Sequence, residues 1–205
     1  MSPITPGAVD LEAITRRPDP GPHQSTILVD GREITTLADL PPMRDGLLFV
    51  GLNPSPVSVE AGHYLQGRLG RTFWRRLMTA RILPPDTVIE TADDSLMAVG
   101  HGLTDLLKVP TARDEATDEI LRAGVGPLWQ KIALWRPAAS VFIYKRAAEI
   151  AAGRRLTEPW GQLRGVALAG RPCFLMPGPY APTEQVDEGL NLLRNLAASL
   201  PVDRP

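Results

Sequence analysis

The chain has 205 residues, of which 43% are hydrophobic and 22% are charged, a composition ordinary for a globular domain with a sizeable core. Its formal net charge of −1 excludes a global attraction to polyanions, so any nucleic-acid binding must come from a local basic patch. The single cysteine, Cys173, excludes an intrachain disulfide and a cysteine-cluster metal or iron–sulfur site.

Residues 1–24 are rich in proline, polar and charged residues, which predicts a flexible tail ahead of a single domain over residues 25–205. The sequence contains neither a signal peptide nor a transmembrane run, so we expect a cytoplasmic protein without membrane contact. We also expect it to be a monomer. Two β-prone runs, at 26–29 and 33–36, flank Asp30-Gly31, which predicts a hairpin with no functional role.

The most informative stretch, residues 46–76, opens with an apolar run flanked by glycines, which predicts a strand buried on both faces. Pro54 cannot continue a central strand, so we expect Asn53 at the carboxyl end of that strand. Ligands bind at that end in open α/β sheets. A glycine-rich loop follows, and Thr72 is predicted to cap the next helix.

The rest of the chain alternates between apolar runs and helical patterns. Including the first, the predicted core strands are 46–51, 102–107, 139–144 and 172–176, with a further strand at 166–169. Later helices are predicted at 93–99, 114–123, 127–135, 145–152 and 183–200. This alternation predicts an α/β fold, a three-layer α/β/α sandwich with a central, mostly parallel sheet.

A group of arginines follows Asn53 in a stretch, 61–85, that contains no acidic residue. These arginines are Arg68, Arg71, Arg75, Arg76 and Arg81. Together with the Asn53 amide and the Tyr64 ring, they suit a planar polar ligand attached to phosphates. The alternative is an ordinary solvated helix face.

Three short motifs within this stretch resemble the mismatch-specific uracil/thymine-DNA glycosylases of the uracil-DNA glycosylase superfamily. They are Gly51-Leu52-Asn53-Pro54-Ser55, Gly62-His63-Tyr64 and Arg71-Thr72-Phe73-Trp74. The family has Gly-Ile-Asn-Pro-Gly, a Gly-His-x-Tyr-like loop and an Asn-x-Phe-Trp helix start in the same order. The resemblance covers residues 46–199, most strongly in these motifs, and implies the uracil-DNA glycosylase fold.

The resemblance also implies a function: hydrolysis of the N-glycosidic bond of uracil, or of another deaminated base, in DNA. Such a monofunctional enzyme flips the base into a pocket, needs no cofactor or metal, and initiates base excision repair. Asn53 would position the water, and Leu52, Ser55, His63 and Tyr64 would bind the base. Asparagine is a poor general base, so we expect a slow enzyme. The alternatives are a core position for Tyr64 and a loop-holding role for His63.

The four arginines Arg68, Arg71, Arg75 and Arg76 would contact DNA phosphates. A second DNA contact is expected from the loop that corresponds to the family's Pro-Asn-Pro-Ser-Gly segment, which enters the minor groove. Its residues are Gly178, Pro179, Tyr180, Ala181 and Pro182. Gly178 replaces the family asparagine, so we expect little dependence on the base opposite the lesion. Similarly, Tyr144 replaces the glycine of the family's Gly-Lys-x-Ala turn.

Two other functions remain open from the sequence. The first is a low-turnover relative that binds uracil-containing or abasic DNA, single- or double-stranded. The second is a nucleotide-binding α/β protein that never contacts DNA.

Overall fold

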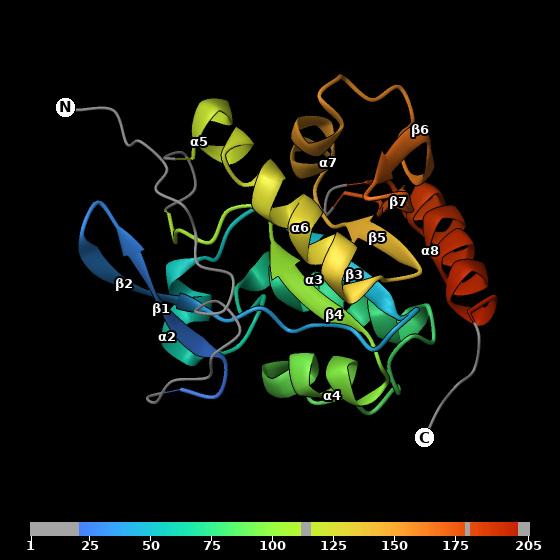
Figure 1. Ribbon diagram of the computed structural model, residues 1–205. Helices are drawn as coiled ribbons and strands as arrows, with labels where there is room; N and C mark the ends of the chain where they lie inside the picture. The colour runs from blue at the N-terminus through green and yellow to red at the C-terminus, as the bar shows by residue number, and fades with distance from the viewer. Residues whose placement is uncertain (1–20, 112–115, 179–180, 201–205) are drawn as a thin grey trace.

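The computed structural model describes residues 21–111, 116–178 and 181–200 (Figure 1). These segments form a three-layer α/β/α sandwich, as the alternation of strands and helices predicted. The central sheet has the strand order β4-β3-β5-β7-β6, and only β6 is antiparallel to its neighbour. Its strands are β3 (Leu47–Gly51), β4 (Gly102–Asp105), β5 (Ala139–Phe142), β6 (Gly161–Leu168) and β7 (Arg171–Leu175).

Helices cover both faces of this sheet (Figure 1). One face carries α3 (Arg68–Thr79), α4 (Ala92–Ala98) and α8 (Thr183–Ala198). The other face carries α5 (Asp118–Arg122), α6 (Val125–Trp135) and α7 (Lys145–Ala152). Because the sheet is covered on both sides, every residue of β3 is buried. Within the described ranges, no helix combines the length and apolar character needed to cross a membrane.

The predicted hairpin is present as β1 (Gln24–Val29) and β2 (Arg32–Leu37), paired antiparallel. Asp30 and Gly31 between them both have positive φ, 51° and 74°, as a tight two-residue turn between twisted strands requires. One residue of the expected tail that lies in the described part of the chain packs in the domain. His23, assigned to the tail from the sequence, is only 2% exposed.

The segment between β3 and α3 contains a helix that the sequence did not indicate, α2 (Pro56–Ala61). Ser55 caps it by accepting a hydrogen bond from the Ser58 backbone N–H, and Pro56 occupies its first turn. Gly62, with φ of 70°, ends it in the left-handed conformation. This short helix brings the chain back so that the following loop packs against the sheet.

The start of α3 differs from the prediction. The helix begins at Arg68 with Gly67 as its N-cap, so Thr72 lies inside it and donates its hydroxyl to the Arg68 carbonyl oxygen. Gly70, expected in the preceding loop, lies in the first turn of the helix, where a Cβ would lie 1.8 Å from the Leu65 carbonyl oxygen. The glycine therefore permits a close chain crossing within the first turn.

The bounds of α5 and β6 also differ from those predicted from the sequence. Helix α5 begins at Asp118, capped by Thr117, whereas the sequence predicted a start at residue 114; residues 112–115 lie outside the described residues. Strand β6 is longer than predicted, because a register shift between Gln162 and Ala167 interrupts its pairing with β7 without ending it. A short 3-10 helix, η1 (Ile89–Thr91), precedes α4.

Candidate active site at the carboxyl edge of the sheet

The parallel strands β3, β4, β5 and β7 all end at the same edge of the sheet. Segments that follow these strands therefore meet there, although they are far apart in the sequence. Asn53 follows β3, Asp105 is the last residue of β4, Tyr144 follows β5, and Pro177 follows β7. This edge is where an open α/β sheet binds its ligands.

Asn53 is half-buried at this edge, as the Asn-Pro break predicted. Its side-chain amide nitrogen donates to the Thr111 hydroxyl at 2.7 Å, and this bond joins the loop after β3 to the segment after β4. Among the described residues, its carbonyl oxygen Oδ1 has no hydrogen-bond partner. The amide is thus held through its donor side, and its acceptor side remains free to orient a water or a base N–H.

Asp105 is a candidate residue that the sequence analysis did not identify. It pairs in register with Gly51 of β3, and a Cβ at Gly51 would lie 2.1 Å from Asp105 Oδ1. The carboxylate therefore lies directly against the β3 backbone. The residue is 4% exposed, and within the described chain Oδ2 has no hydrogen-bond partner. Burial raises the pKa of Asp105 to about 6, opposed by the positive charge of Lys108.

A buried ionic cluster lies behind Asp105. The Asp39 carboxylate forms ion pairs with Lys108 Nζ at 3.0 Å and Lys131 Nζ at 2.8 Å, and it accepts a hydrogen bond from the Thr104 hydroxyl at 2.6 Å. Burial opposes ionisation of Asp39, but the two lysines outweigh it and lower its pKa. The cluster thus keeps two ammonium groups near Asp105 without satisfying its carboxylate directly.

Tyr64 belongs to the core, which corrects its expected role as a stacking surface for the base. It is 2% exposed, its hydroxyl donates to the Ala38 carbonyl oxygen at 2.8 Å, and the same hydroxyl accepts from Lys108 Nζ at 2.8 Å. A buried ring whose hydroxyl is held by two partners offers no surface to an incoming base in this structure. The alternative interpretation, a packed core aromatic, describes it better.

The other residues of the predicted base-binding set have mixed positions. His63 is 12% exposed, and its Nδ1 lies 2.8 Å from Asp93 Oδ1, so it fastens the loop rather than facing a base. Ser55 uses its hydroxyl to cap α2. Leu52 is half-buried, and its carbonyl oxygen accepts from the Leu107 N–H beside Asn53.

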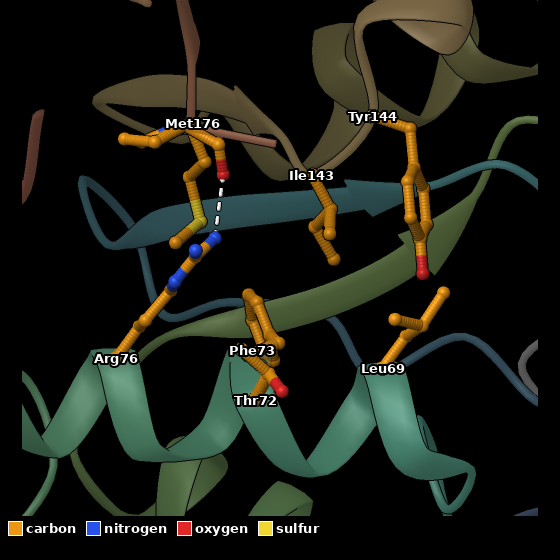
Figure 2. A pocket seen from close by; sticks show the side chains of 8 residues that line it. Leu69, Thr72, Phe73, Arg76, Ile143, Tyr144 and Met176 are labelled. Atoms are coloured by element: carbon orange, nitrogen blue, oxygen red, sulfur yellow. Dashed lines mark hydrogen bonds between the residues drawn. The ribbon is translucent and has the colours of Figure 1, made fainter. Parts of the chain in front are cut away.

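The arginines of α3 divide into two groups. Arg68, Arg71 and Arg75 are exposed, and their spacing of three and four residues places them on one helix face. No ion pair to them is found in the described part of the chain. Arg76 points toward the segment after β7 (Figure 2). It donates to the carbonyl oxygens of Pro177 and Gly178, at 2.8 and 3.1 Å. Its expected phosphate contact is therefore replaced by a loop-anchoring role.

A small pocket lies between α3 and the segments after β5 and β7 (Figure 2). Its lining residues are Leu69, Thr72, Phe73, Arg76, Ile143, Tyr144, Met176 and Pro177. The Tyr144 ring extends toward Leu69 and closes one end. Burial and, to a smaller extent, the negative charge of Asp105 raise the pKa of Tyr144. Its volume of about 10 Å³ holds about one water molecule, not a flipped pyrimidine.

The loop predicted to enter the DNA minor groove starts at the edge of this pocket. Gly178 is half-buried, and a Cβ there would meet no atom within 4 Å, so the glycine is not required by packing. Ala181 donates its N–H to the Gly178 carbonyl oxygen at 3.0 Å, and the exposed Pro182 precedes α8. Pro179 and Tyr180 lie outside the described residues.

A search against protein-family models finds none that matches the chain.

Proposed function

We propose that the chain is a monofunctional DNA glycosylase that hydrolyses the N-glycosidic bond of uracil or another deaminated base, as the first step of base excision repair. The observation that supports this best is the meeting of Asn53 and Asp105 at the ends of adjacent parallel strands. A neutral amide and a buried, unpaired carboxylate lie at the same edge of the sheet as a small pocket bounded by the arginine-bearing helix α3.

The chemistry requires a group that activates water, because an amide does not accept a proton at neutral pH. Asp105 has a pKa of about 6, raised by burial, so most of it is ionised at pH 7 yet it remains a stronger base than an ordinary carboxylate. Asn53 then orients the water through its free Oδ1, and Asp105 takes the proton. The carboxylate also stabilises the positive charge that develops on the sugar as the base leaves.

Binding to DNA would use the exposed face of α3. Arg68, Arg71 and Arg75 point into solvent and are available to phosphates. Arg76 fixes the start of the loop beyond β7 against α3, so that this loop stands beside the pocket. A base enters only if the pocket widens, and the Tyr144 ring is the side chain that must move.

A second candidate is a DNA-binding protein with little turnover, which recognises uracil or an abasic site. The small size of the pocket favours this alternative, because a space for about one water molecule accepts no flipped base. The two candidates share the DNA-binding face and differ only in whether a base is released.

The test is single-turnover release of uracil from oligonucleotides that are single-stranded, paired with guanine or paired with adenine, with gel-shift binding measured alongside. We expect release by the wild type and its loss in Asp105→Asn, with DNA affinity preserved. Asp86→Asn, an exposed carboxylate outside the site, is the matched control. Binding without release would favour the second candidate, and neither binding nor release would refute both.

A further inference from the structure

A second cluster of polar side chains lies outside the proposed active site. His23 precedes β1, His63 follows α2, and Asp93 and Asp94 lie in the first turn of α4. Each offers one nitrogen or oxygen atom, and these atoms all lie within 4.8 Å of one another. Three separate parts of the chain thus converge on one point.

The contacts within the cluster are close. His23 Nε2 lies 2.7 Å from Asp94 Oδ1 and 4.0 Å from Asp93 Oδ2, and His63 Nδ1 lies 2.8 Å from Asp93 Oδ1. A tetrahedral zinc ion with bonds of about 2.0 Å holds its ligand atoms about 3.3 Å apart. The observed separations bracket this value, so a metal ion requires only small side-chain movements.

The burial of the cluster is graded. Asp93 is fully buried and His23 is 2% exposed, whereas Asp94 is 51% exposed. The inner side of the cluster is therefore closed and rigid, and the outer side is open to solvent. In addition, the backbone N–H of Tyr64 donates to Asp93 Oδ2 at 2.8 Å. Such a bond to a carboxylate orients it, as outer contacts do for metal ligands.

We propose that His23, His63, Asp93 and Asp94 bind one divalent transition-metal ion, of which Zn²⁺ suits the ligands best. Two imidazole nitrogens and two carboxylate oxygens form a borderline donor set that favours Zn²⁺ over the hard ions Mg²⁺ and Ca²⁺. Metal binding replaces the present histidine–aspartate hydrogen bonds. The sequence alone indicated no metal site, because the two histidines are distant along the chain.

The position of the cluster indicates what the ion does. It joins the start of β1, the loop that carries His63 and Tyr64, and helix α4. The ion is therefore structural, holding the loop between β3 and α3 in place, and this inference does not depend on the glycosylase proposal. Because Asp94 faces solvent, the ion can enter and leave without unfolding of the chain.

The experiment uses the full chain, stripped of metal with a chelator and titrated with ZnCl₂ by calorimetry, with bound metal counted by elemental analysis after dialysis. We expect one zinc per chain, a raised thermal unfolding temperature with zinc, and no comparable effect of MgCl₂ or CaCl₂. His63→Asn and the solvent-facing Asp94→Asn should each weaken zinc binding at least tenfold.

His101→Asn is the matched control, because it removes the remaining histidine of the chain, which lies outside the cluster. We expect it to bind zinc as the wild type does. Wild-type protein that binds no zinc would overturn the proposal. The same conclusion would follow if Asp94→Asn, checked for native circular dichroism, bound zinc with unchanged affinity, or if only His101→Asn lost it.

Discussion

The buried Asp105 carboxylate makes a specific prediction about stability. In the unfolded chain this group has an ordinary pKa of 3.8, whereas burial raises the pKa in the folded chain to about 6. One pKa unit corresponds to 1.36 kcal/mol, so holding the ionised group in the fold costs about 3 kcal/mol at neutral pH. Replacing Asp105 with asparagine, which is neutral at every pH, removes this cost.

The direction in which stability changes with pH follows from which state, folded or unfolded, binds the Asp105 proton more tightly. Between pH 4 and pH 6 the folded protein holds the proton on Asp105 more tightly than the unfolded chain does. The stability of the wild type relative to Asp105→Asn is therefore greatest below pH 4 and falls as the pH rises through 6. Any effect on stability of replacing a protonated carboxyl group with an amide is the same at every pH, so it cancels when the stability difference between the two proteins is compared across pH values.

The assay is urea unfolding of both proteins between pH 4 and pH 8, with Asp86→Asn as control. We expect the free energy of unfolding of Asp105→Asn to gain about 2.4 kcal/mol on the wild type from pH 4 to pH 7. A gain below about 1 kcal/mol, or one equal to that of the control, would refute the buried, unpaired state of the carboxylate. If base release also disappears in Asp105→Asn, the group is retained for chemistry at the expense of stability.

Three further predictions concern the proposed site. Asn53→Ala should reduce single-turnover base release far more than DNA affinity, and an equal loss of both would argue against a role in positioning water. Replacing Arg71 and Arg75 with alanine should make the slope of log K for DNA binding against log salt concentration less steep, by roughly 0.9 per lost contact on a duplex or 0.7 on a single strand. An unchanged slope would show that these arginines only form a solvated helix face. Tyr144→Ala should open the pocket and speed release of uracil, measured on single-stranded DNA, while slower release would show that the ring binds the base instead of excluding it.

The order of strands and helices could be predicted from the sequence because it depends on local patterns. The apolar run before Gly51 formed a central strand, the Asn53-Pro54 break followed it at the ligand-binding edge, and the Asp30-Gly31 turn formed its hairpin. Element boundaries were less accurate where a glycine had a tertiary role. Helix α3 includes Gly70, where the Leu65 backbone passes too close for a Cβ, and no local propensity indicates such a crossing.

The sequence by itself thus determined the three-layer fold and the position of Asn53, since both follow from periodicity and from chain-breaking residues. Only the tertiary structure decided which side chains surround Asn53. Tyr64 contacts Lys108, 44 residues away in the sequence, and Arg76 contacts Gly178, 102 residues away. Because of these contacts, Tyr64 is not placed to stack on a base and Arg76 is not placed to bind a phosphate. Asp105 became a candidate base, and His23 and His63 candidate metal ligands, for the same reason. The burial of a side chain and its hydrogen-bond or ion-pair partners depend on which distant segments the sheet brings together, and no local sequence pattern specifies that.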